Sequence, residues 1–185
     1  RTFFSVPEEL VSEITTFGHL KGDQFIQDKE WQYRDLKTTK YEGGGGLFST
    51  FHDYGQFITC ILNDGKLNGK QILKKETIDL MFMNNMGEHF TVYDDPCIEH
   101  TYLFNMNAKN VGVNKFGLGW AVDQTGRKGI RAPGTVYWSG AACTFYSMDR
   151  KNGKAVLFFS NTLPWSNIHA ESAYMKSESI LYGTK

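Results

Sequence analysis

This sequence of 185 residues has no excess of positive or negative charge, because its 20 lysines and arginines balance its 20 aspartates and glutamates. The basic residues do not form a clustered stripe either. Proteins that bind nucleic acid through their overall field carry a net positive charge or a basic patch. We therefore predict no nucleic-acid partner.

Long hydrophobic runs are also missing. No apolar stretch approaches the roughly 18 residues that a membrane-spanning helix needs, and the first four residues lack the layout of a signal peptide. We predict no membrane segment in this chain. The compartment stays open, because any targeting segment would precede residue 1.

Cysteine is scarce. Cys60, Cys97 and Cys143 are widely spaced and odd in number, which argues against a disulfide framework and against a zinc site. Cys60 on a predicted helix and Cys143 in a predicted strand are expected to be buried free thiols. The histidines and acids of residues 88–100 are spaced irregularly, so we expect no metal and no cofactor.

Glycine, by contrast, is concentrated in the run Gly43 to Gly46. Glycine loses the most conformational freedom on folding, so four in a row indicate a backbone conformation chosen over packing. No lysine follows them in the pattern of a phosphate-binding loop. The favoured interpretation is a flexible connection that leads into a helix.

The stretch after this run predicts an amphipathic helix. Its apolar residues recur at spacings of three, four and seven: Phe51, Tyr54, Phe57, Ile58, Ile61 and Leu62. Thr50 and Asp53 form a capping box at its start. A second helix is predicted over residues 75–84, with Ile78, Met81 and Phe82 facing inward.

Strands are predicted in the last third of the chain. Residues 116–122 alternate bulky and small side chains, as in one strand with a bare face. Residues 135–138 read as a second strand, and 142–149 pair with 154–161 across an Asn-Gly turn. A polar-to-apolar helix then ends near Leu181.

These patterns divide one domain into five segments. They are an irregular lead-in (1–40), the glycine run and helices (41–85), a long loop (86–114), antiparallel strands (115–162) and a C-terminal helix (163–185). Helices packed on an antiparallel sheet make an α+β fold.

Several of these segments together resemble the second half of the serine β-lactamase-like hydrolases. This family includes class C β-lactamases, penicillin-binding D,D-peptidases, and related esterases and acyltransferases. The resembling pieces, in register over about residues 41–165, are YEGGGGLFST (41–50), DY (53–54), ILNDG (61–65), IL (72–73), ET (76–77), Asn84, FGLGW (116–120) and YWSGAA (137–142). The resemblance implies a β-lactamase/transpeptidase-like fold.

Two motifs of that family are missing. The sequence holds no S-x-x-K, which would supply the nucleophilic serine and its lysine, and no Y-x-N, which would supply the tyrosine base. The family has both before the glycine-rich segment. The resemblance therefore implies a C-terminal portion whose N-terminal strands and catalytic helices lie outside this chain. Its partner would be that missing segment, and the chain alone is expected to be inactive.

The third motif of the family, a K-T-G-like strand end, corresponds to Trp138-Ser139-Gly140. By this resemblance the N–H of Ala141 is an oxyanion-hole donor, and Ser139 offers its hydroxyl to the substrate or the general base. Glycine lets the strand edge approach the acyl group closely.

Trp138 stands where β-lactamases and D,D-peptidases usually carry lysine. Without that cation, neutral esters are favoured over β-lactams and peptide C-termini. Tyr41 and Gly45 are candidate substrate contacts by the same resemblance. We expect a serine hydrolase that forms an acyl-enzyme with an ester, amide or lactam, closer to a carboxylesterase or acyltransferase; the alternative is a non-catalytic binding or scaffolding module.

Overall fold

The computed structural model describes residues 1–28, 35–89 and 114–183. At its centre is a five-stranded antiparallel sheet with the order β5-β6-β7-β8-β9. Its strands are β5 (Asn114–Phe116), β6 (Ala121–Asp123), β7 (Thr135–Gly140), β8 (Thr144–Asp149) and β9 (Lys154–Phe158). The long loop predicted over residues 86–114 falls mostly outside the described residues.

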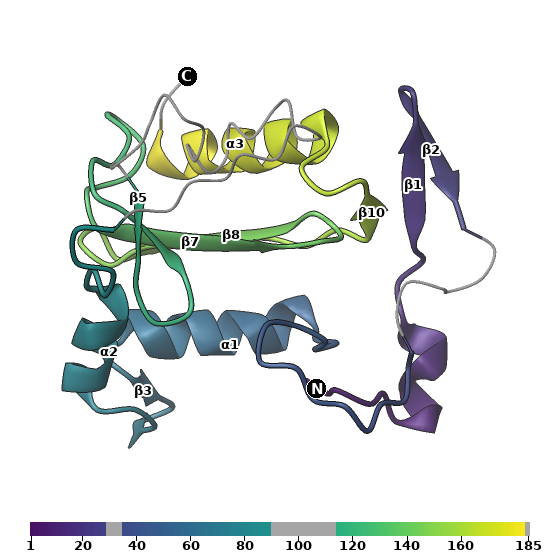
Figure 1. Ribbon diagram of the computed structural model, residues 1–185, viewed down its shortest axis with the longest axis horizontal. Coiled ribbons are helices and arrows are strands. Elements are labelled where there is room, and N and C mark those ends of the chain that lie inside the picture. The colour runs from purple at the N-terminus through teal and green to yellow at the C-terminus, as the bar shows by residue number, and fades with distance from the viewer. Residues whose placement is uncertain (29–34, 90–113, 184–185) are drawn as a thin grey trace.

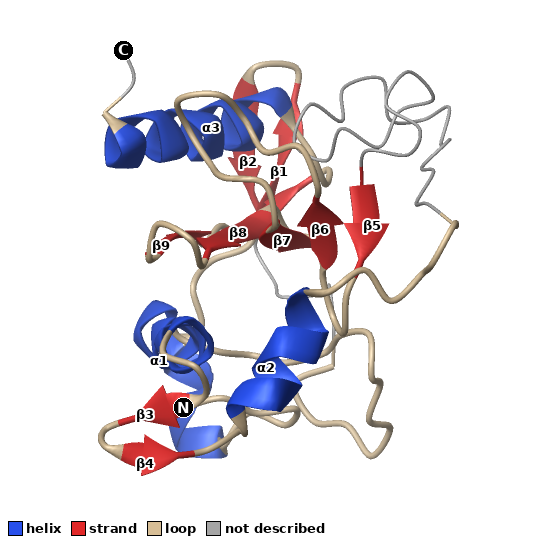
Figure 2. Cartoon of the chain, turned by 90° about the vertical axis from the view of Figure 1, so that its left-hand side faces the viewer, coloured by secondary structure: helices blue, strands red, loops and turns tan. Residues whose placement is uncertain are grey.

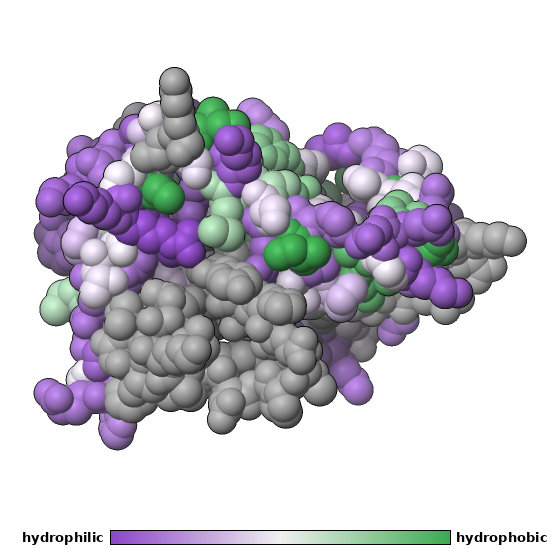
Figure 3. Space-filling view, turned by 90° about the horizontal axis from the view of Figure 1, so that it is seen from above, coloured by the Kyte–Doolittle hydropathy of each residue, from purple (hydrophilic) through white to green (hydrophobic). Residues whose placement is uncertain are grey.

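Helices cover both faces of this sheet. Helix α3 (Ile168–Tyr182) lies on one face, and α1 (Phe51–Leu62) and α2 (Lys75–Phe82) lie on the other, as Figures 1 and 2 show. Seen from the α3 side, the described surface is mainly hydrophilic, with hydrophobic residues at separate places (Figure 3). The predicted α+β arrangement is confirmed.

The sheet separates two hydrophobic clusters. The cluster toward α3 consists of Ala121, Tyr137, Cys143, Phe145, Val156, Ala170 and Tyr174. The cluster toward α1 and α2 consists of Ile58, Ile61, Ile78, Trp120, Val122, Val136, Tyr146 and Met148. Neighbouring residues of one strand enter opposite clusters because side chains alternate across a sheet. Cys60 and Cys143 are buried free thiols, as predicted, and Cys97 lies outside the described residues.

Helix α1 begins and ends where the sequence predicts. The Thr50 hydroxyl accepts a hydrogen bond from the Asp53 N–H at 3.1 Å, as an N-cap does. The predicted inward stripe is only partly correct, since Phe51 is 59% exposed and Phe57 is 40% exposed. Phe51 instead packs edge to face against Phe159. The buried face of α1 is therefore narrower than the apolar pattern predicts.

The prediction of one strand over residues 116–122 is wrong. The chain turns between β5 and β6, and Gly119 has a φ of +100° that favours glycine. A Cβ on Gly117 would lie 2.0 Å from the Met81 carbonyl oxygen, which also accepts the Trp120 indole N–H at 2.8 Å. The small residues thus make a turn against the end of α2, and period-two alternation alone does not distinguish such a turn from a strand.

The lead-in of residues 1–40 contains a short helix and a hairpin. A 3-10 helix, η1 (Glu8–Glu13), follows Pro7, and β1 (Gly18–Lys21) and β2 (Gln24–Gln27) form a hairpin. β1 also pairs in parallel with β10 (Thr162–Leu163). This pairing joins residues about 140 apart, so no local pattern predicts it. The residues that follow α1 form a small hairpin, β3 (Lys66–Leu67) and β4 (Lys70–Gln71).

Candidate functional site

The four predicted site residues lie consecutively at one end of β7. Trp138, Ser139 and Gly140 are the last three residues of the strand, and they pair with Tyr146, Phe145 and Thr144 of β8. β6 pairs with residues 135–137, so in the described part of the chain no strand pairs with residues 139 and 140 on the β6 side. This end of β7 is therefore an open strand edge of the kind that an acyl group requires.

Ala141 begins the turn between β7 and β8. The turn contains residues 141–143, and its last residue, Cys143, has a φ of +57°. A three-residue hairpin loop of this type places its third residue in the left-handed conformation, where glycine is the common choice. Ala141 is exposed, whereas Cys143 is fully buried. The end of the turn at Cys143 is therefore fixed in the core, whereas Ala141, whose N–H is the predicted oxyanion-hole donor, is accessible to solvent.

Gly140 has room for a side chain within this chain. A Cβ at this position would lie 3.6 Å from the Thr144 Cβ, which is an ordinary van der Waals contact. Its φ is not in the left-handed region either. Neither packing nor backbone conformation in the described residues requires glycine here.

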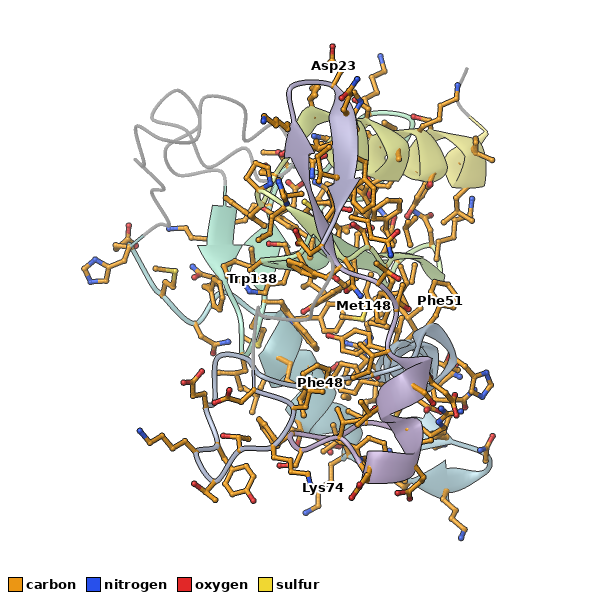
Figure 4. The ribbon with its side chains drawn as sticks, turned by 90° about the vertical axis from the view of Figure 1, so that its right-hand side faces the viewer. Asp23, Phe48, Phe51, Lys74, Trp138 and Met148 are labelled. Carbon is orange, nitrogen blue, oxygen red and sulfur yellow. The ribbon has the colours of Figure 1, made fainter. Side chains whose placement is uncertain are left out.

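Trp138 is partly exposed and contacts a second aromatic ring. Its ring is 36% exposed and meets Phe116 edge to face, with the ring centroids 5.1 Å apart. Leu118 in the neighbouring turn is 48% exposed. Figure 4 shows Trp138 at this end of the sheet, above Phe48 of the segment that follows the glycines. Two aromatic rings, Trp138 and Phe116, therefore lie next to the strand edge.

Residues 162–167 support this turn from behind, and no sequence pattern predicted their role. The Thr162 N–H donates to the Ala142 carbonyl at 3.2 Å, and the Trp165 indole N–H donates to the Ser139 hydroxyl oxygen at 3.0 Å. The Asn167 amide donates to the Cys143 sulfur at 3.1 Å. Asn167 before the predicted helix is an N-cap signal that predicts the start of α3, but no local pattern predicts its link to the turn.

A buried carboxyl group lies in the first turns of α3. Glu171 is 1% exposed; one of its oxygens accepts from the Ser166 hydroxyl, and the other has no hydrogen-bond partner in the described residues. Burial raises the pKa of Glu171 to about 7. This carboxyl was also missed, because its position on the helix resembles that of an ordinary solvated acid.

A second buried group ties α3 to the sheet. Arg131 pairs with Asp123 and with Glu178, each at 3.3 Å, and its guanidinium lies 4.9 Å from the centre of the Tyr137 ring. Glu178 also accepts from the Ser147 hydroxyl at 2.8 Å. The buried charges are paired with one another, so this cluster links α3 to the sheet behind the site.

Tyr41 and Gly45 lie in the glycine-rich segment. Tyr41 is 71% exposed and contacts Phe4 edge to face at 5.2 Å. A Cβ on Gly43, Gly44 or Gly45 would meet nothing within 4 Å, whereas Gly46 has a φ of +98°. Only Gly46 needs glycine for its conformation. The role of Tyr41 and Gly45 as substrate contacts stays a prediction.

In the described ranges, no three His, Cys, Asp or Glu side chains gather as a metal ion would require. Residues 90–100 of the acidic stretch lie outside those ranges. None of the helices that the structure describes has the length and apolarity needed to cross a membrane.

Comparison with known proteins places these features in a wider context. The family model described as Beta-lactamase matches residues 2–177. Two curated relatives from Mycobacterium tuberculosis, Protein Rv1367c of strain H37Rv and Uncharacterized protein MT1414 of strain CDC 1551, are each 28% identical over 142 residues. The match covers 74% of this chain and 33% of each relative, so the chain spans about a third of their length.

Solved structures share the fold at low sequence identity. Unliganded Simvastatin Synthase (LovD) from Aspergillus terreus, as the selenomethionyl derivative, has a TM-score of 0.77 and 19% identity, over 98% of this chain and 46% of LovD. EstCE1, described as a hydrolase with promiscuous acyltransferase activity, has a TM-score of 0.57 and 19% identity, over 87% of this chain and 41% of EstCE1. The fold implied by the resemblance is confirmed.

Proposed function

Because the chain belongs to the beta-lactamase family, we propose that it is the C-terminal part of a serine hydrolase that acts through an acyl-enzyme. The Ala141 N–H is one donor of the oxyanion hole, and Ser139 offers its hydroxyl to the substrate or the general base. The nucleophilic serine, its lysine and the tyrosine base come from outside residues 1–185.

The observation that carries this proposal is the open end of β7. Residues 139 and 140 have no strand partner toward β6 in the described part of the chain, and a Cβ on Gly140 would make only an ordinary contact with Thr144. An oxyanion hole needs backbone N–H groups beside a place where the acyl carbon can sit. The end of β7 meets that requirement, because glycine there allows close approach.

The substrate class follows from Trp138. An aromatic ring replaces the cation that would pair with a substrate carboxylate, and Phe116 adds a second apolar ring beside it. Neutral esters with apolar groups suit this surface better than anionic β-lactams. A carboxylesterase or acyltransferase activity also agrees with the description of EstCE1.

In this proposal the missing N-terminal segment binds along the edge of the sheet at β9. β9 is an edge strand whose one neighbour among the described strands is β8, and unpaired edges associate readily. Upstream strands pair with β9, so this chain alone is unstable or associated. A monodisperse monomer that unfolds cooperatively without any other segment would contradict this part of the proposal.

The test joins this chain to the segment encoded immediately before Arg1. The joined protein is expected to hydrolyse p-nitrophenyl esters and to be labelled at one serine by a fluorophosphonate, while this chain alone does neither. A folded joined protein that gives neither signal would overturn the proposal and favour a binding or scaffolding module. Finding S-x-x-K and Y-x-N in that segment would eliminate this alternative.

A further inference from the structure

Trp165 is bonded to the hydroxyl of a predicted site residue. Its indole N–H donates to the Ser139 Oγ at 3.0 Å. The ring packs against the hydrophobic cluster between the sheet and α3, so its direction is fixed by the core. An indole N–H is a donor only. The bond therefore assigns the Ser139 oxygen as the acceptor.

This assignment determines what the Ser139 hydroxyl can still do. A hydroxyl has one proton to donate and two lone pairs with which to accept. Among the described residues no acceptor takes the Ser139 proton, so it remains for a group outside them. The indole also limits rotation of the hydroxyl, since only some rotamers keep the 3.0 Å bond.

The backbone on both sides of Trp165 is tied to the same turn. Before it, the Pro164 carbonyl accepts from the Cys143 thiol at 3.2 Å. After it, Asn167 donates to that carbonyl at 3.2 Å and to the Cys143 sulfur at 3.1 Å. The indole and the β7–β8 turn therefore form one unit, and the indole does not move independently of the Ala141 N–H.

We propose that Trp165 is a positioning residue that holds the Ser139 oxygen as an acceptor and so directs the Ser139 proton toward the bound acyl substrate. This inference rests on the proposed function, because Ser139 needs an acyl substrate to act on. Trp165 acts on the acyl substrate through the Ser139 hydroxyl.

The first test is a double-mutant cycle in the joined protein. Trp165→Phe keeps the packed ring and removes the N–H, and it is expected to lower kcat for a p-nitrophenyl ester about tenfold, which is the effect of one hydrogen bond. In the Ser139→Ala background the same change is expected to alter kcat by less than about twofold. Equal effects in the two backgrounds would overturn the proposal, because a merely structural role does not depend on the hydroxyl.

Trp120 supplies the matched control. Its indole N–H donates to the Met81 carbonyl at 2.8 Å, in the other hydrophobic cluster. Trp120→Phe is expected to lower stability while leaving kcat per folded molecule unchanged, and its effects are expected to add to those of Ser139→Ala. Coupling between Trp120 and Ser139 as strong as that of Trp165 would overturn the proposal.

A second measurement does not depend on activity or on folding of the Trp165 variant. In ¹H–¹⁵N spectra, Ser139→Ala is expected to shift the Trp165 indole resonance and to speed its hydrogen exchange, with the Trp120 indole unchanged. An unaffected Trp165 resonance would overturn the proposal even if the joined protein is active. If the resonance shifts as expected but the joined protein is inactive, the proposed function is refuted. The Trp165–Ser139 hydrogen bond would then exist without a role in catalysis.

Discussion

The side-chain amide of Asn167 donates to the sulfur of Cys143 at 3.1 Å, and its oxygen accepts from the Ala170 N–H at 3.0 Å. One side chain therefore caps helix α3 and holds the left-handed end of the β7–β8 turn. The position of the helix start and the shape of the turn that presents Ala141 are coupled through this residue.

Replacing Asn167 is expected to separate these two roles. Asn167→Ala removes the cap and the link to Cys143, and should lower the free energy of unfolding by about 2 kcal/mol, roughly 1 from each. Asn167→Ser keeps a capping oxygen and should recover about half. Urea unfolding measures both. Thr50→Ala, which removes only the cap of α1, is the control; equal losses from Asn167→Ala and Asn167→Ser would contradict the dual role.

The sequence predicts the parts of this fold that rest on local patterns. Helix α1 combines an apolar stripe with a capping residue, and the β8–β9 hairpin has an Asn-Gly signal at its turn, so both appear where predicted. The parallel pairing of β1 with β10 joins distant residues, and neither strand has a pattern of its own. The contacts of Trp165 and Asn167 with the turn fail to appear in the sequence for the same reason.

Gly140→Ala is expected to separate stability from activity. Because a Cβ would make only an ordinary contact with Thr144, stability should stay within about 1 kcal/mol of the original chain. Ester hydrolysis by the joined protein should fall at least about tenfold, since the methyl group would occupy the place where the acyl group approaches. Thermal unfolding and kcat/KM measured side by side check this. Unchanged activity in Gly140→Ala would show that Gly140 is not part of the active site.

The four glycines of residues 43–46 are expected to respond differently to alanine. Gly45→Ala adds a Cβ in open space and should leave stability unchanged or slightly higher, because it restricts the unfolded chain. Gly46→Ala forces alanine to a φ of +98° and should cost about 1 kcal/mol or more. Denaturant unfolding distinguishes them. A loss of esterase activity in Gly45→Ala at unchanged stability would support Gly45 as a substrate contact.

Glu171 should make stability depend on pH. Burial raises its pKa in the folded state from 4.5 to about 7, so the folded state holds this proton more tightly than the unfolded state does. The contribution of Glu171 to stability is therefore fully present below about pH 4.5 and is lost as the pH rises toward 7. Each pKa unit corresponds to about 1.4 kcal/mol, which gives a loss of about 3 kcal/mol across this window.

Glu171→Gln isolates this effect. Glutamine stays neutral, so the difference in unfolding free energy between Glu171→Gln and the original chain should shift in favour of the variant as the pH rises from 4.5 to 8. Urea unfolding at several pH values provides the measurement. Parallel curves for the two proteins would show that Glu171 does not titrate in this range.

Arg131 is expected to be the most costly charged residue to remove. It is buried between Asp123 and Glu178, whose carboxylates are also buried. Arg131→Met leaves the buried Asp123 carboxylate without this cation and Glu178 with the more distant Arg127, at 3.7 Å, and removing one partner of a buried pair costs about 3–5 kcal/mol. Denaturant unfolding near pH 7 should show this loss.

A double variant tests whether the unpaired buried charge causes the loss of stability in Arg131→Met. Arg131→Met with Glu178→Gln removes one buried negative charge and keeps an oxygen for the Ser147 and Tyr174 hydroxyls, so it should be more stable than Arg131→Met alone. Arg150, which pairs with Asp64 and with Asp79 near the surface, is the matched control, and Arg150→Met should cost clearly less because solvent screens its partners. Equal losses at the two arginines would mean that packing of the side chain, and not the buried charge, accounts for the contribution of Arg131.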